Sequence, residues 1–155
     1  MYRRKAVPLI VMGFLWLSAC GSLRSFPGPA ATPKNAWSSI GLTQTGGFAG
    51  VHLKVKVSRE GWLTAEDQRS GRTLTTPLSE ETLHELDQLV AHTRLPATEH
   101  VPSMCADCFI YELEIVSTTG VVRFQADDAN LEESGARALI QFLSEIRDLA
   151  LQSTS

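Results

Sequence analysis

The sequence has no apolar run long enough to cross a membrane and no excess of basic charge. Its longest apolar stretch, residues 6–17, has 12 residues. As a helix this stretch would extend about 18 Å, which is short of a hydrocarbon core of about 30 Å. The formal net charge of the 155 residues is −3. These absences exclude a multi-span membrane protein and argue against a nucleic-acid binder, and the length favours one domain.

The sequence also lacks the motifs that usually mark an active site. It contains no His-Glu-x-x-His helix, no phosphate-binding loop and no Gly-x-Ser-x-Gly turn. Its histidines are scattered, at His52, His84, His92 and His100. No second cysteine pair and no spaced histidine pair completes a zinc site. We therefore expect a protein that is not an enzyme and that holds no metal or cofactor.

The first 19 residues have the pattern of a bacterial export signal. Residues 3–5 are basic, the apolar stretch follows, and residues 17–20 read Leu-Ser-Ala-Cys. This order resembles a lipobox, in which the cysteine is acylated before cleavage; the alternative is an ordinary secretory signal with a chance cysteine. We predict a lipoprotein signal peptide over residues 1–19 and lipid attachment, palmitate included, at Cys20. Without the signal, the mature chain carries a net charge of −6.

Lipidation at Cys20 would place the protein in the bacterial cell envelope. Acyl chains contribute about 0.8 kcal/mol per buried CH₂, so several of them form an effectively permanent membrane anchor. In Gram-negative lipoproteins a residue such as Gly21 at the next position, in place of Asp, favours the outer membrane, facing the periplasm. Residues 20–36 are rich in Pro, Gly and Ser and predict a flexible linker with a reach of about 20 Å. Residues 37–155 then form a single domain.

The domain has the periodicities of an α+β fold. Apolar and polar residues alternate over residues 51–57 and 109–116, and a Thr-Thr-Gly turn connects the latter to a strand at 121–126. Shorter strands are expected at 61–66 and 72–75. Helices are predicted from Ser79, which can cap, and through the apolar stripe from Leu139 to Leu149. The most economical packing is an antiparallel sheet of about four strands with two helices on one face.

The other face of this sheet is predicted to be charged. It would carry Lys54, Lys56, Glu112, Glu114 and Arg123. Opposite charges on adjacent strands can pair there, each contributing roughly 0.2–1 kcal/mol. The simpler interpretation is a solvated face, and the alternative is a surface that docks a partner.

Cys105 and Cys108 form an even pair once Cys20 is used for lipid. Export to an oxidising compartment favours a disulfide, which would contribute about 2 kcal/mol by closing so short a loop. A redox role would need a thiolate at a helix N-terminus, but a predicted strand follows. A zinc role would need further ligands, for which His100 and Asp107 are the nearest candidates.

A glycine-rich segment directly precedes the strand at 51–57. It consists of Gly46, Gly47, Phe48, Ala49 and Gly50. Glycines permit positive φ or the close approach of another chain. The segment is either a bulged turn with Phe48 in the core, or a partner-binding loop from which Phe48 projects.

The Gly-Gly-Phe-Ala-Gly run and the strand after it resemble the emfourin family, inhibitors of protealysin, a thermolysin-like metalloprotease. The resemblance continues through residues 78–86, 111–115 and 122–127 and covers about residues 41–146. It implies a small α/β inhibitor. The chain departs from the family in its lipobox, its linker and its Cys105–Cys108 pair, which suggest an exported branch.

Two functional hypotheses follow from the sequence, and an envelope enzyme comes third. The first is a membrane-anchored envelope lipoprotein whose domain binds a protein and sterically inhibits a thermolysin-like metalloprotease, with residues 46–50 at the edge of the contact. The second is a structural or assembly lipoprotein that binds another envelope protein through the charged sheet face and has no protease target.

The lipidation site is directly testable. Cys20→Ser should leave an unprocessed precursor, because the acylated thiol is what commits the chain to cleavage at residue 20. Gel mobility and labelling with a palmitate analogue measure both steps. Normal maturation and membrane retention of the variant would contradict the assignment.

Overall fold

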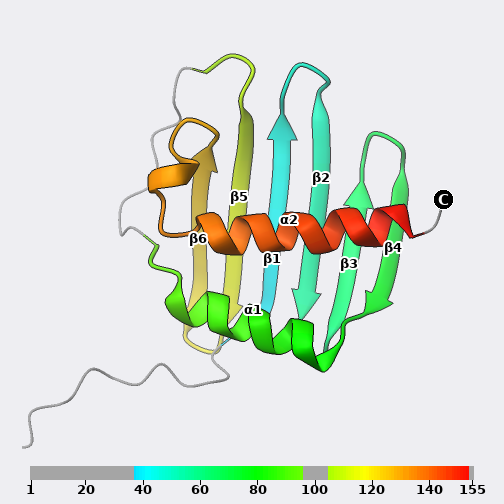
Figure 1. Ribbon diagram of the computed structural model, residues 1–155, viewed down its shortest axis with the longest axis vertical. Coiled ribbons are helices and arrows are strands. Elements are labelled where there is room, and N and C mark those ends of the chain that lie inside the picture. The colour runs from blue at the N-terminus through cyan, green and yellow to red at the C-terminus, as the bar shows by residue number, and fades with distance from the viewer. Residues whose placement is uncertain (1–36, 96–104, 154–155) are drawn as a thin grey trace, which may run out of the picture. The chain divides into compact units, whose positions relative to one another are not determined.

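The computed structural model describes residues 37–95 and 105–153, which fold as a six-stranded antiparallel sheet with two helices on one of its faces (Figure 1). The predicted signal peptide (1–19), Cys20 and the linker through residue 36 lie outside these residues. The strands are β1 (Trp37–Gly46), β2 (Val51–Ser58), β3 (Trp62–Asp67), β4 (Arg72–Pro77), β5 (Phe109–Ser117) and β6 (Gly120–Asp127). The helices are α1 (Glu80–His92) and α2 (Arg137–Gln152), with a 3₁₀ turn, η1 (Leu131–Glu133), before α2.

The strand order is β4-β3-β2-β1-β5-β6, so β1 occupies the interior of the sheet. It pairs antiparallel with β2 on one side and with β5 on the other; Leu42, for example, lies between Val55 and Leu113. The α+β class and the two helices are confirmed, but the sheet has six strands where about four were expected.

The added interior strand, β1, gives only a weak signal in the sequence. Its residues on the face away from the helices are small or polar (Ser39, Gly41, Thr43 and Thr45), and only Trp37, Ile40 and Leu42 are buried. A strand is recognised by regular alternation of apolar and polar residues. The pairing of β1 with two neighbours is encoded by no pattern within its own residues.

The core lies between the sheet and the two helices. Helix α2 crosses in front of the strands, and α1 lies across one end of the same face (Figure 1). Their apolar stripes bury Leu86, Leu139, Ile140 and Leu143 against Ile40, Leu42, Val55, Val57, Leu63 and Leu113. Full burial of such side chains contributes about 1.5–3 kcal/mol each. No helix among the described residues is long and apolar enough to cross a membrane.

Helix α1 begins as the sequence predicts. The Ser79 hydroxyl accepts a hydrogen bond from the backbone N–H of Thr82 at 3.1 Å, which satisfies one of the free donors of the first turn. Glu80 and Glu81 follow in that turn, where a carboxylate favours the positive end of the helix dipole.

Asp87 ties α1 to the end of the sheet where β1 begins. Its carboxylate accepts a hydrogen bond from Trp37 Nε1 at 2.8 Å and a two-pronged contact from the Arg59 guanidinium, whose Nη2 lies 3.0 Å from Oδ2. The guanidinium also lies over the Trp37 ring, 4.8 Å from its centroid. Desolvation raises the pKa of Asp87, but the hydrogen bonds from Arg59 and Trp37 and the charge of Arg59 outweigh it, so the pKa lies below its ordinary value.

Replacing this carboxylate should destabilise the domain. We expect Asp87→Asn to lower the free energy of unfolding by about 1–2 kcal/mol at pH 7, because a partly buried guanidinium loses its counter-charge. The pKa of Asp87 is lower in the folded than in the unfolded protein, where it is near 4. Ionised Asp87 therefore stabilises the fold above about pH 4, and this stabilisation is lost as the pH falls through the folded-state pKa.

Urea unfolding at pH 7 and at about pH 2 measures both effects, and the difference between variant and unaltered protein should shrink at the lower pH. Glu85→Gln, at an exposed carboxylate of the same helix, is the control and should stay within about 0.5 kcal/mol. Equal losses for the two variants would contradict the proposed role of Asp87.

Candidate functional site

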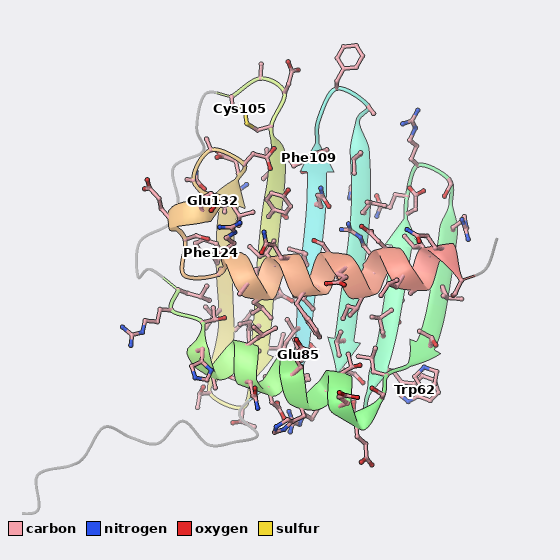
Figure 2. The ribbon with its side chains drawn as sticks, viewed as in Figure 1. Trp62, Glu85, Cys105, Phe109, Phe124 and Glu132 are labelled. Atoms are coloured by element: carbon pink, nitrogen blue, oxygen red, sulfur yellow. A yellow bond between two sulfur atoms is a disulfide. The ribbon has the colours of Figure 1, made fainter. Side chains whose placement is uncertain are left out.

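Three connections gather at the end of the sheet where β1 finishes. Gly46, the last residue of β1, pairs with Val51 on β2 and with Phe109 on β5. The turn at residues 47–50 therefore lies beside the segment at 105–108. The β3–β4 turn at 68–71 lies at the same end, and Figure 2 labels Cys105 and Phe109 there. We call residues 46–50 the Phe48 loop.

Phe48 projects from this loop into solvent. Its side chain is 99% exposed, whereas every other large apolar residue among those described is 59% exposed or less. Of the two possibilities that the sequence left open, the structure therefore has the projecting phenylalanine and not the core one. The ring therefore adds no buried area to the domain and is available for contact with a partner.

The backbone on both sides of Phe48 is fixed by hydrogen bonds. The Gly47 N–H donates to the carbonyl of Cys108 at 3.2 Å, and the Gly50 N–H donates to the carbonyl of Gly47 at 3.0 Å. Gly46, Gly47 and Gly50 all have positive φ, between 60° and 97°. Residues with a side chain rarely adopt this backbone conformation, so the three glycines permit the tight turn.

Two of these glycines are also required by space. A Cβ on Gly46 would lie 2.5 Å from the Cys108 carbonyl oxygen, and one on Gly47 would lie 2.6 Å from the Phe109 ring. A Cβ on Gly50 would meet nothing within 4 Å. The loop is thus packed against β5 at its start and has open space beside Gly50.

A disulfide shapes the segment on which the loop rests. Cys105 and Cys108 are joined, with their Cα atoms 5.5 Å apart. The Cys108 carbonyl is the acceptor for Gly47, and Phe109, the next residue, supplies the ring beneath it. The bridge therefore restricts the residue that positions the Phe48 loop.

Asp128 holds the beginning of β5 from the other side. Its Oδ2 accepts from the Phe109 N–H at 2.8 Å, and its Oδ1 accepts from the Tyr111 hydroxyl at 3.0 Å. Desolvation and the Asp128 carboxylate raise the pKa of Tyr111 to about 12. The phenol therefore stays protonated and continues to donate at neutral pH.

Arg69 reaches the loop from the β3–β4 turn. Its Nη1 donates to the Ala49 carbonyl at 3.0 Å. The turn itself is organised by Asp67, which accepts from the Ser70 hydroxyl at 2.7 Å and from the Arg69 N–H at 3.0 Å. The Ser70 hydroxyl lowers the pKa of Asp67, and the backbone donors act in the same direction. The Phe48 loop is therefore supported from both sides.

Sequence reasoning identified the loop and the cysteine pair but missed Arg69 and Asp128. Asp67 three residues before Ser70 and four before Gly71 is a recognisable turn signal, but it says nothing about where Arg69 reaches. Of the histidines, His84 and His92 both bond to Gln88 on α1, and His100 lies outside the described residues. In the described part of the chain, no group of three or more His, Cys, Asp or Glu residues is placed to hold a metal ion.

No protein-family model and no curated protein matches the chain. The resemblance to the emfourin family therefore stays a prediction that rests on residues 41–146.

The two ends of the Phe48 loop should respond differently to an added methyl group. Gly46→Ala should lower the free energy of unfolding by about 2–4 kcal/mol, because its Cβ meets a backbone carbonyl in addition to the strain of positive φ. Gly50→Ala has the strain alone and should cost about 1 kcal/mol. Chemical denaturation measures both values, and a Gly50→Ala loss as large as that of Gly46→Ala would contradict the packing described.

Proposed function

We propose that this protein is a lipid-anchored binding protein of the bacterial cell envelope that sterically inhibits a thermolysin-like metalloprotease. The Phe48 loop would insert at the edge of the protease cleft, and Cys20 would attach the chain to the membrane. The domain would act by occupying the cleft and would itself perform no chemistry.

One observation supports protein binding: a fully exposed phenylalanine stands on a loop whose backbone is held by hydrogen bonds. The choice of a thermolysin-like protease rests on the resemblance of residues 41–146 to the emfourin family. Binding normally costs the entropy of ordering the contact segment, and a preordered loop avoids much of that cost. Buried aromatic anchors also account for a large part of the energy of many protein interfaces. The contacts to Cys108, Phe109 and Arg69 provide the order, and Phe48 provides the anchor.

The residues beside Phe48 suit insertion into a cleft. Ala49 and Gly50 have almost no side chain, and a Cβ on Gly50 would meet nothing within 4 Å, so the wall of a partner can approach the backbone on that side of the ring. The position of the loop also suits an anchored protein. Trp37 and Gly46 are at opposite ends of the ten-residue strand β1, which is about 30 Å long. The loop therefore lies at the end of the strand away from the residue that follows the linker.

Phe48→Ala should separate binding from folding. The substitution removes a side chain that has no contacts in the domain, so the free energy of unfolding should change by less than about 0.5 kcal/mol. Stoichiometric inhibition of a thermolysin-like protease should weaken at least about tenfold, the usual cost of losing a central aromatic anchor. Titration of the protease with the purified protein gives the inhibition constant.

Leu149→Ala is the matched control, because Leu149 is an exposed apolar residue (59%) on α2, away from the loop. It should inhibit like the unaltered protein. Equal weakening by both substitutions, or a well-folded protein without effect on any protease of this class, would contradict the proposal.

The alternative, an assembly lipoprotein, is distinguished by what the protein holds in its own membrane. Pull-down of the lipidated chain from its envelope should recover a metalloprotease that Phe48→Ala no longer retains. Recovery of the same partners by both forms would favour a role for another surface.

A further inference from the structure

Among the described residues, no helix or loop covers the second face of the sheet. Both helices lie on the other face (Figure 1). We call this second surface the outer face. Strand register aligns two rows of residues across its centre, Lys56–Gly41–Glu114 and Lys54–Thr43–Glu112. The charged face that the sequence predicts is thus present, and Glu114 pairs with Arg123 on β6.

Two pairs of opposite charges flank β1 on the outer face, with Glu66 on β3 beside Lys54 and Arg123 on β6 beside Glu114. The two lysines lie on β2, the two glutamates lie at the same heights on β5, and Gly41 and Thr43 separate them. Each lysine is therefore two strand spacings, about 9.6 Å, from the glutamate of its own row. At that distance the two charges of a row are not neighbours, and a partner placed over the face can approach both, Glu114 in addition to its ion pair with Arg123.

We propose that the outer face binds a second copy of the same chain, related by a two-fold axis that runs along β1. This rotation places β2 of each copy over β5 of the other. Lys54 then lies over Glu112 of the second copy, and Lys56 over Glu114. Four charge pairs form from two patches on each copy, as an isologous contact requires.

The other way to stack two such faces is electrostatically unfavourable. A two-fold axis perpendicular to the strands would place β2 over β2 and β5 over β5. Lysines would then oppose lysines and glutamates would oppose glutamates, which costs free energy. The charge pattern therefore selects the axis along β1.

The same axis brings together two of the exposed apolar side chains. A third row on the outer face crosses β1 at Ser39, which pairs with Ser58 on β2 and with Val116 on β5. On β3 this row continues at Trp62, because the next residue, Leu63, pairs with Val57. On β6 it continues at Val121, the partner of Val116. Trp62 is 50% exposed and Val121 is 49% exposed. Rotation about β1 places β3 over β6, so each ring would cover the valine of the other copy.

The dimensions fit a weak, reversible contact. Stacked sheets lie about 10 Å apart, a gap that extended Lys and Glu side chains fill from the two sides. The part of the outer face formed by β3, β2, β1, β5 and β6 measures about 24 Å across the strands and about 25 Å along them. Two such faces would bury about 1,200 Å² in total. That is the lower end of the range for specific interfaces, and exposed charge pairs make such a contact sensitive to salt.

The arrangement also suits two chains on one membrane. Rotation about β1 leaves the direction of that strand unchanged, so both Trp37 residues lie at one end of the pair and both Phe48 loops at the other. The placement of both chains on one membrane rests on the proposed lipid anchor, which would also raise the effective concentration of the copies. The contact itself does not depend on inhibition or on lipidation.

Cysteine cross-linking in the full chain tests the axis. Thr43 lies on β1, so its two copies should face each other across about 10 Å, which is too far for a disulfide but within reach of a short bismaleimide. Thr43→Cys should therefore form a covalent dimer when this reagent is added to the envelope of the producing cell. Thr73 is on the same face but on β4, three strands and about 14 Å from the axis. Thr73→Cys should therefore give at least about tenfold less dimer on a non-reducing gel. Equal yields, no dimer for Thr43→Cys, or a product whose mass is not twice that of the chain would overturn the proposal.

Charge reversal tests the pairing. In the Thr43→Cys chain, Lys54→Glu with Lys56→Glu should abolish the dimer, and so should Glu112→Lys with Glu114→Lys. Production of both variants together, with different tags, should restore a mixed dimer, which also shows that both fold. Glu85→Lys with Glu145→Lys changes the net charge as Glu112→Lys with Glu114→Lys does, but on exposed helix positions, and should leave the dimer intact. Dimer formation unaffected by either reversal, or lost in the helix control, would contradict the pairing.

Salt gives a further measurement that needs no charge variant, in case one of them does not accumulate. Cross-linking of Thr43→Cys should fall several-fold between about 0.05 M and 0.5 M salt, because the Debye length shortens. An unchanged yield would count against charge pairing.

Discussion

The position of β1 between β2 and β5 is the constraint on which the rest of the structure depends. Antiparallel pairing on both sides brings Gly46 opposite Phe109, so the turn after β1 must rest against the segment that the disulfide closes. The same pairing sets lysines on one side of β1 and glutamates on the other, at matching heights. One strand therefore positions both surfaces to which we assign binding.

The two surfaces differ in how they would gain affinity. The Phe48 loop has a small area but a fixed backbone, and its contribution would come from one aromatic ring that loses little entropy on binding. The outer face is broad and charged, so it would gain more in specificity and orientation than in strength. They lie at different places on the sheet, the first at its end and the second across its face, so one copy can use both.

Much of the fold could be predicted from the sequence, because the buried face of a helix or a half-buried strand determines the spacing of its apolar residues. The stripe around Leu86, the hairpin at 109–126 and the charged face with Lys54 and Glu112 all have this origin. Strand β1 could not be predicted, since its outward residues are small and polar. The supports from Arg69 and Asp128 were missed for a related reason: each is a contact between distant segments, which exists only once the strand order is set.

The central claim is that the Phe48 loop is ordered before any partner binds. Its glycines would make a free loop flexible, and the contacts to Cys108, Phe109 and Arg69 restrain it, together with the Gly50–Gly47 hydrogen bond. Backbone ¹⁵N relaxation of the free protein measures this directly at residues 47–50. We predict order parameters near 0.85, as in the strands of the sheet, and values below about 0.6 would contradict the claim.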